Sequence, residues 1–216
     1  MDFEKNNFYH IFNRGNNSQK VFFIRENYLF FLKKMKRQIQ PFASIVSWCL
    51  MPTHFHLLVF VNHEKVQIED IGNNLKIQTE RIQTFNQSLG VLLSSYTKAI
   101  QNQEKITGSL FQKRTKAKLI FDEIEIEPAY WDYAFGTTIN IPEGKSYLET
   151  CIEYIHQNRV YSNFVKNTED WEFSSMKDFL GLRQGKLIDY GLLEREKLLP
   201  EGRLQTHFPA KVRGNE

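Results

Sequence analysis

Residues 43–61 read ASIVSWCLMPTHFHLLVFV, two short apolar segments separated by Met51-Pro52-Thr53. Segments 43–50 and 54–61 are rich in β-branched and aromatic residues, which is typical of two core strands joined as a hairpin. Because side chains alternate along a strand, residues 54, 56, 58 and 60 should share one face. Both faces of the second segment are apolar apart from its histidines, which indicates a central strand, either covered on both sides or covered on one side and carrying a site on the other.

The segments around this hairpin supply the other elements of the predicted fold. Upstream, 7–12 (NFYHIF) predicts a strand and the apolar periodicity of 26–38 predicts an amphipathic helix. Downstream, 71–102 predicts a helical region interrupted near Gly90, and 116–121 predicts a fourth strand. The order β-α-β-β-α-β predicts an α+β protein with a ferredoxin-like (RRM-like) antiparallel sheet. Such a sheet carries two helices on one face and leaves the other open for binding.

The C-terminal part of the chain predicts one more helix. Segment 146–158 (SYLETCIEYIHQN) has an apolar stripe, and Tyr154 and Asn158 lie one turn apart beside it. Segment 122–144 predicts a loop insertion, and 170–182 predicts a small closing helix or turn. We therefore expect one domain over residues 1–182, with an added helix that bears Tyr154, and a C-terminal extension over residues 183–216.

Length and composition set the class of protein. A chain of 216 residues with 41% hydrophobic and 25% charged residues is typical of one globular domain. Two cysteines, Cys49 and Cys151, exclude a disulfide-rich module and a four-thiolate zinc site. The N-terminus lacks the pattern of a signal peptide, and no apolar run reaches the roughly 18 residues of a membrane span. We expect a cytoplasmic protein with no membrane partner.

The charge is small in total but unevenly distributed. The formal net charge is +3, yet residues 105–118 contain five basic residues and no acid, whereas 122–127 (DEIEIE) is almost purely acidic. Clustered basic residues are typical of nucleic-acid surfaces, and equally of a solvated basic patch.

His54 and His56 form the first candidate site. Imidazoles at i and i+2 of a strand project from one face, and together they can provide two ligands for a divalent ion. The alternative is two histidines that cap a core strand, although each buried ring nitrogen then needs a partner. The sequence contains no HExxH, phosphate-binding loop or GxGxxG motif, so no nucleotide cofactor is expected. A metal site with open coordination positions favours catalysis over a structural role.

Several motifs together resemble a known family. The stretch 51–59 (MPTHFHLLV) is similar to the HUH motif, histidine-hydrophobic-histidine, of single-tyrosine transposases, and 154–158 (YIHQN) is similar to their tyrosine helix. YHIFNRG at 9–15, GSLFQKR at 108–114 and DWEFSS at 170–175 are similar to segments of the REP-associated tyrosine transposases. The resemblance covers roughly residues 7–182, and the sequence departs from it after Asn158, where RVYSN replaces a Pro-Val-Arg-Ala-Gly-like continuation.

This resemblance implies a specific chemistry. In that family His54, His56 and Asn158 would hold Mg²⁺ or Mn²⁺ against the scissile phosphate, and Tyr154 would attack it to form a 5′-phosphotyrosine. The expected partner is single-stranded or hairpin DNA. Related enzymes act as homodimers with an exchanged tyrosine helix or as monomers, and both alternatives stay open.

Basic residues are the candidates for gripping the DNA backbone. They lie at the end of the first strand, on the second helix and around the fourth strand: Arg14, Lys98, Lys113, Arg114, Lys116 and Lys118. Gly15 would allow the substrate to approach the backbone closely. Phe111 could stack on a base, although core packing is the simpler interpretation. His156 is predicted to be structural, and Tyr96 is not a candidate nucleophile because no ligand residue lies one turn away from it.

Two other functions remain as alternatives. A non-catalytic DNA-binding regulator with the same fold would bind hairpins without metal dependence. A zinc hydrolase built on His54 and His56 would carry stoichiometric zinc and form no covalent DNA adduct.

Overall fold

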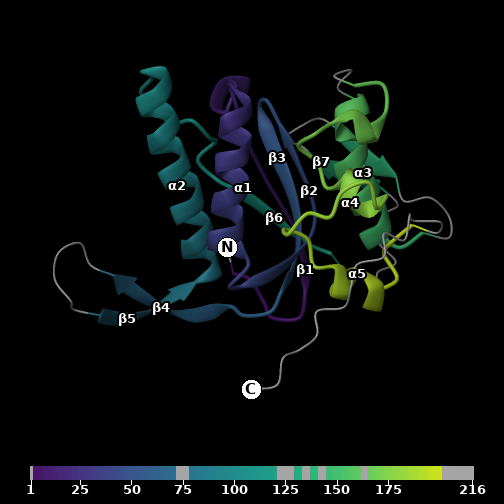
Figure 1. The fold of residues 1–216 in the computed structure, drawn as a ribbon, viewed down its shortest axis with the longest axis horizontal. Coiled ribbons are helices and arrows are strands. Elements are labelled where there is room, and N and C mark those ends of the chain that lie inside the picture. Colours follow the sequence, from purple (N-terminus) through teal and green to yellow (C-terminus); the bar gives the residue numbers. More distant parts are fainter. Residues whose placement is uncertain are drawn as a thin grey trace.

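The computed structural model describes residues 2–71, 78–120, 129–132, 137–140, 145–161 and 165–200. Its centre is an antiparallel sheet of four strands, β1 (Phe8–Arg14), β2 (Ala43–Met51), β3 (His54–Val61) and β6 (Lys116–Ile120), in the order β2-β3-β1-β6. Helices α1 (Arg25–Ile39) and α2 (Phe85–Glu104) connect these strands (Figure 1). This is the predicted ferredoxin-like order, and the strands predicted from residues 7, 43, 54 and 116 onward are confirmed.

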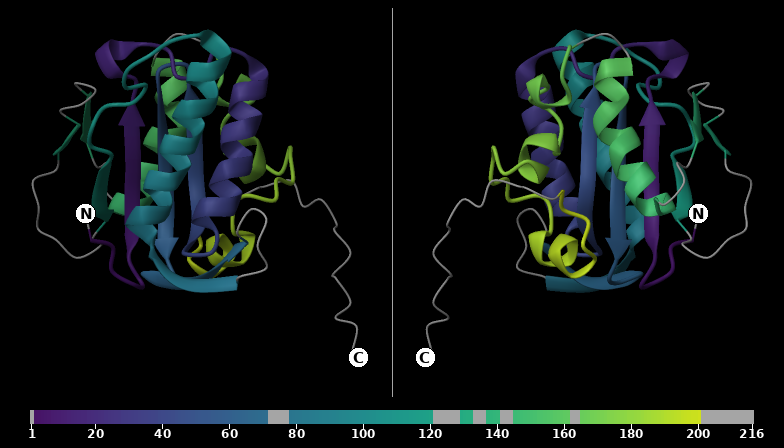
Figure 2. Two further views of the ribbon diagram at one scale, coloured as in Figure 1. Left: turned by 90° about the vertical axis from the view of Figure 1, so that its left-hand side faces the viewer. Right: turned by 90° about the vertical axis from the view of Figure 1, so that its right-hand side faces the viewer.

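Helices α1 and α2 cover one face of the sheet (Figure 2, left view). Buried aromatic side chains fill the space between these helices and the sheet. Phe31 of α1 lies 4.9 Å from the Tyr96 ring of α2 and 5.3 Å from the Phe55 ring of β3, measured between ring centroids. The Tyr96 hydroxyl donates a hydrogen bond to the Val21 carbonyl at 2.7 Å. Phe111 is also buried against this cluster, so its interpretation as a core residue is confirmed.

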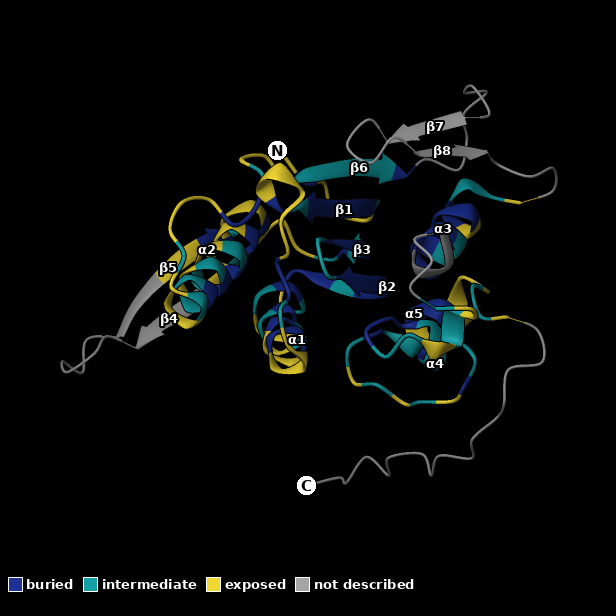
Figure 3. Cartoon of the chain, turned by 90° about the horizontal axis from the view of Figure 1, so that it is seen from above, coloured by how far each residue is buried: buried dark blue, intermediate teal, exposed yellow. Residues whose placement is uncertain are grey.

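A third helix, α3 (Tyr147–Tyr161), covers the opposite face of the sheet (Figure 2, right view; Figure 3). Its first turn is capped by Ser146, whose hydroxyl accepts a hydrogen bond from the Glu149 amide at 3.1 Å. The predicted apolar stripe is buried against the sheet: Leu148, Cys151, Ile152 and Ile155. The expectation of an open sheet face is therefore wrong, because the tyrosine-bearing helix lies on the face that the ferredoxin-like order leaves uncovered.

The segment between β3 and α2 differs from the prediction. Residues 65–71 and 78–84 form a two-stranded hairpin, β4 (Lys65–Ile71) and β5 (Gln78–Thr84), which projects past α2 (Figure 1). The helix begins only at Phe85, because Thr84 and Gln87 form a capping box with reciprocal side-chain hydrogen bonds of 3.2 and 2.9 Å. The helical prediction is wrong for residues 71 and 78–84, and residues 72–77 lie outside the described residues. Helix α2 continues through Gly90 without interruption.

Part of the predicted loop insertion also contains strands. β7 (Ala129–Asp132) and β8 (Thr137–Asn140) pair as an antiparallel hairpin, so the prediction of a loop is wrong for these segments. The rest of 122–144 lies outside the described residues.

The segment after α3 covers the free edge of β2. The Leu50 amide donates to the Phe173 carbonyl and the Ser175 amide donates to the Trp48 carbonyl, so 173–175 run beside the strand in extended form. Two short helical turns flank this stretch, η2 (Thr168–Asp170) and α4 (Met176–Phe179), and they account for the helical part of the predicted closing element.

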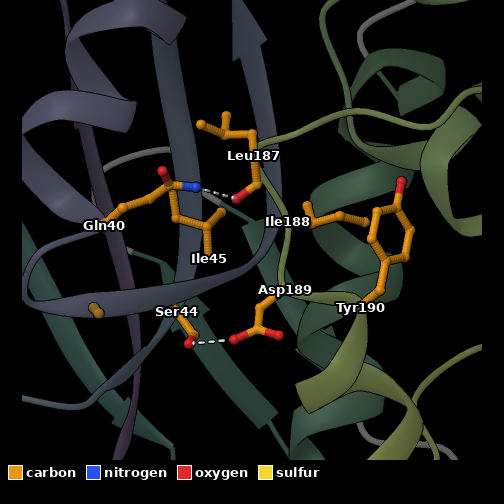
Figure 4. Close-up of a pocket in the computed structure, with 8 residues that line it drawn as sticks. Gln40, Ser44, Ile45, Leu187, Ile188, Asp189 and Tyr190 are labelled. Carbon is orange, nitrogen blue, oxygen red and sulfur yellow. Dashed lines mark hydrogen bonds between the residues drawn. The ribbon is translucent and has the colours of Figure 1, made fainter. Parts of the chain in front are cut away.

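Residues 183–200 pack on the same domain. Asp189 donates its amide to Ile45 and accepts a 2.6 Å hydrogen bond from the Ser44 hydroxyl, and Gln40 donates to the Leu187 carbonyl (Figure 4). Helix α5 (Tyr190–Arg195) follows. The division of the chain at residue 182 stays a prediction, and 201–216 lie outside the described residues. Among the helices that are described, none is both long and apolar enough to cross a membrane.

Candidate functional site

The strand register gathers the candidate residues on the α3 face of the sheet. His56 of β3 lies opposite Phe12 of β1 and Cys49 of β2, and His54 lies opposite Arg14. On the far side of β1, Lys118 lies opposite His10. Since residues opposite each other across a ladder share a face, His10 and Lys118 point to the same side as the two histidines.

Asn158 connects α3 to both histidines of β3. Its amide oxygen lies 3.1 Å from His54 Nε2, and its amide nitrogen lies 3.3 Å from His56 Nε2. The other ring nitrogens also have partners, Thr53 Oγ1 at 2.9 Å for His54 Nδ1 and His10 Nε2 at 2.9 Å for His56 Nδ1. The two imidazoles therefore converge on one amide group.

Tyr154 lies one helical turn before Asn158 and meets the same cluster. The centroid of its ring is 5.3 Å from that of His56, edge to face, and 6.0 Å from that of His10. The residue is 5% exposed, and its hydroxyl oxygen is shielded from solvent. The tyrosine helix thus packs on the histidines of its own chain.

Burial keeps the core of this cluster uncharged. Burial, with a smaller contribution from Lys118, lowers the pKa of His10 to about 3. Burial also lowers the pKa of His56 well below its ordinary value, and the neighbouring His10 and His54 lower it further. Both rings are neutral at pH 7, so each has one nitrogen with an available lone pair.

The donor set fits a divalent cation. His54, His56 and Asn158 bring two imidazole nitrogens and one amide oxygen together, and an amide oxygen suits Mg²⁺ or Mn²⁺ while imidazole suits transition ions. The described part of the chain holds no group of three or more His, Cys, Asp or Glu suited to a metal ion. A cation here would therefore depend on the asparagine as third protein ligand.

The fold is matched by a solved structure. No protein-family model matches the sequence, and no curated protein matches it. The structure of a REP-associated tyrosine transposase bound to a REP hairpin is similar over 88% of this chain and 92% of that chain, with a TM-score of 0.52 and 17% identity. This chain has the fold of a REP-associated tyrosine transposase. At that identity the likeness concerns the fold, and it confirms the resemblance at that level.

Within this transposase fold, the predicted basic residues fall into two groups. Arg14, Lys116 and Lys118 lie on strands at the α3 face, and Lys113 and Arg114 are exposed just before β6. Lys98 lies on α2, beyond the opposite face of the sheet. Its position separates it from the histidine cluster, and the DNA-binding role of all six residues stays a prediction.

The loop after β1 gives a reason for glycine at residue 15 that differs from the close approach of substrate expected from the sequence. A Cβ at this position would lie 2.1 Å from the Gln19 carbonyl oxygen, so the chain itself makes the close approach that requires glycine. The short turn η1 (Asn16–Ser18) follows, and Ser18 accepts a 2.6 Å hydrogen bond from the Arg14 guanidinium.

Sequence reasoning missed His10. The residue lies within the quoted YHIFNRG motif, but its contact with His56 depends on the pairing register of β1 and β3, which no local pattern specifies. His156 accords with the predicted structural role: it is buried, and its Nε2 lies 2.8 Å from the Ser175 hydroxyl, away from the Asn158 amide group.

Proposed function

We propose that this protein is a metal-dependent endonuclease and strand transferase for single-stranded, hairpin-bearing DNA, with Tyr154 as nucleophile. The proposal rests on one observation: the ring of Tyr154 lies 5.3 Å from His56, within the cluster that His54, His56 and Asn158 form in a single chain. The fold of a transposase that binds a REP hairpin supports the choice of substrate.

His54, His56 and Asn158 would hold the divalent ion. A bound Mg²⁺ or Mn²⁺ would withdraw charge from the scissile phosphate and favour the phenolate of a tyrosine beside it. The neutral imidazoles suit this role, because a protonated ring has no lone pair to offer. The helix α3 would orient Tyr154 relative to these ligands, since Tyr154 and Asn158 are one turn apart.

Tyr154 would supply the attacking oxygen. Its phenolic oxygen forms a bond to phosphorus while the bond from phosphorus to the 3′-oxygen breaks. The phenol loses its proton, and the departing 3′-oxygen gains one and becomes a hydroxyl. The 5′-phosphotyrosine retains the energy of the phosphodiester, so a second strand can be joined without ATP.

Basic side chains would neutralise the DNA backbone beside this site. Arg14, Lys116 and Lys118 share the sheet face of the histidines, and Lys113 and Arg114 extend the positive surface at the start of β6. The logarithm of the DNA-binding constant should fall linearly with the logarithm of the salt concentration, because each neutralised phosphate releases a counterion.

One observation favours a second candidate, a DNA-binding regulator of the same fold that does not cleave. The Tyr154 hydroxyl is shielded from solvent, so a phosphate can reach it only if α3 shifts or the substrate opens the contact. The regulator would bind hairpin DNA equally well with and without a divalent ion.

An adduct assay tests the proposal. The protein is incubated with Mn²⁺ and a single-stranded hairpin. The label is on the fragment 3′ of the cleaved bond, which keeps the phosphate and would be joined to the tyrosine. A covalent product is sought on a denaturing gel. We expect an adduct with the wild type and with Tyr96→Phe, which removes a buried hydroxyl on the other face, and none with Tyr154→Phe. An adduct formed by Tyr154→Phe would contradict the nucleophile, and metal-independent hairpin binding without any adduct would favour the regulator.

A further inference from the structure

His10 is the one member of the buried cluster to which neither the sequence nor the proposed function gives a role. It is 0% exposed, the centroid of its ring lies 5.1 Å from that of His56, and its Nε2 lies 2.9 Å from His56 Nδ1, so the two rings meet through their nitrogen atoms. We propose that His10 is a positioning residue, which holds the proton of His56 on Nδ1 and so presents the Nε2 lone pair to a divalent cation. This inference rests on the proposed function.

The direction of the hydrogen bonds follows from the amide of Asn158. Its nitrogen can only donate, so His56 Nε2, at 3.3 Å, must accept. A neutral imidazole carries one proton, and that of His56 is therefore on Nδ1. His56 Nδ1 then donates to His10 Nε2, which accepts.

The same reasoning gives His54 the opposite tautomer. The amide oxygen of Asn158 can only accept, so His54 Nε2 donates and His54 Nδ1 accepts from the Thr53 hydroxyl at 2.9 Å. Cation binding would require the proton of His54 to move from Nε2 to Nδ1. The Thr53 hydroxyl can then rotate and accept a hydrogen bond from Nδ1. His56 needs no such change, so of the two histidines it is the one already prepared for the ion.

His10 also has a chemical feature that packing alone does not require. A phenylalanine at residue 10 would fill similar space but could not accept a hydrogen bond from His56 Nδ1. The buried N–H of His56 would then have no acceptor in this position. The hydrogen-bond partners of metal-ligating histidines fix ring orientation and tautomer, and their loss typically weakens metal binding about 10- to 100-fold.

The first test observes the proton directly in the metal-free protein. Long-range ¹H–¹⁵N correlation spectra of ¹⁵N-histidine-labelled wild type distinguish the two tautomers of each ring. We expect His56 and His54 to show opposite tautomers, with the His56 proton on Nδ1. A His56 proton on Nε2 overturns the inference, whether or not any variant folds.

The second test measures Mn²⁺ affinity by calorimetry on wild type, His10→Phe and His10→Gln, with Tyr96→Phe as a buried-hydroxyl control. We expect binding by His10→Phe to weaken about 10- to 100-fold, and His10→Gln to restore most of it, because the glutamine oxygen can accept the same proton. Tyr96→Phe should bind as wild type does. Equal affinity of His10→Phe and wild type would overturn the positioning role.

The two tests separate this inference from the proposed function. A wild type that binds no divalent cation contradicts the proposed function, and the spectra then decide the position of the proton on their own. If the wild type binds Mn²⁺ and His10→Phe binds it equally tightly, the proposed function stands and only the positioning role of His10 is contradicted.

Discussion

Each face of the sheet is covered by a helix that buries a tyrosine, Tyr96 of α2 and Tyr154 of α3, and the two tyrosines have opposite surroundings. Tyr96, on α2, is surrounded by aromatic rings, and its hydroxyl donates to a backbone carbonyl. Tyr154, on α3, lies edge to face with two imidazoles. Their exposures are 0% and 5%, so burial does not separate a packing tyrosine from a candidate nucleophile. What distinguishes them is the chemistry of the groups that each ring contacts.

This difference suggests that the face under α1 and α2 contributes mainly to folding stability, and that the face under α3 carries the candidate chemistry. Burial of aromatic side chains against α1 and α2 contributes strongly to folding, because each ring removes a large apolar area from water. Hydrogen bonds within the histidine cluster contribute little net stability, since the same groups are well solvated in the unfolded chain. We therefore expect mutations on the two faces to affect different measurements.

The largest effect on stability is expected at the centre of the aromatic face. Phe31→Ala should lower the free energy of unfolding by about 3–5 kcal/mol, because it leaves a cavity among Phe22, Phe55 and Tyr96. Thermal unfolding should show a decrease of roughly 2–4 °C for each kcal/mol. The Mn²⁺ affinity of the folded protein should stay that of the wild type; a loss comparable to that expected for His10→Phe would show that the faces are coupled.

Local sequence patterns were sufficient to predict most elements of the sheet. Strands β2 and β3 are marked by short apolar segments around a proline turn, and α3 is marked by its apolar stripe. The hairpin β4–β5 was missed because 78–84 (QTERIQT) is polar and has no apolar alternation. The capping signal Thr84-x-x-Gln87 was present and would have placed the start of α2.

The candidate site could be predicted only in part, for a related reason. His54 and His56 are neighbours in one strand, and Tyr154 and Asn158 are neighbours in one helix, so each pair forms a local motif. His10 reaches His56 only through strand pairing, and the separation of Lys98 from the other basic residues depends on which face α2 covers. Long-range packing decides both, and local periodicity does not encode it.

The two tyrosines can also be compared through their hydroxyl groups. Tyr96→Phe should lower the free energy of unfolding by about 1–3 kcal/mol, because the buried Val21 carbonyl loses its hydrogen-bond donor. Urea unfolding of Tyr96→Phe and wild type measures this difference, and the adduct assay should detect no change. A Tyr96→Phe variant that unfolds like the wild type would show that water or another donor replaces the hydroxyl at little cost.

The smallest effect concerns the start of the helix that carries Tyr154 and Asn158. The amide and hydroxyl of Ser146 both donate to the Glu149 carboxylate at 2.8 Å, which lowers the pKa of Glu149 below its ordinary value of 4.5. Because the folded state favours the charged form, this stabilisation is present above pH 4.5 and is lost as the pH falls below it. Glu149→Gln should therefore cost about 0.5 kcal/mol at pH 7, a small value because solvent screens this exposed group.

The pH dependence of that difference separates charge from helix propensity. Urea unfolding of wild type and Glu149→Gln should give converging free energies below pH 4, while protonation of the buried histidines affects both proteins equally and cancels. Glu153→Gln is the matched control, because it removes another exposed carboxylate of α3, one that pairs with Lys145 outside the cap. A Glu149→Gln difference that is the same at pH 7 and at low pH would mean that the carboxylate charge does not stabilise the start of α3. The orientation of α3 would then depend on its packing against the sheet face that carries His54 and His56, and the charge of the cap would not contribute to it.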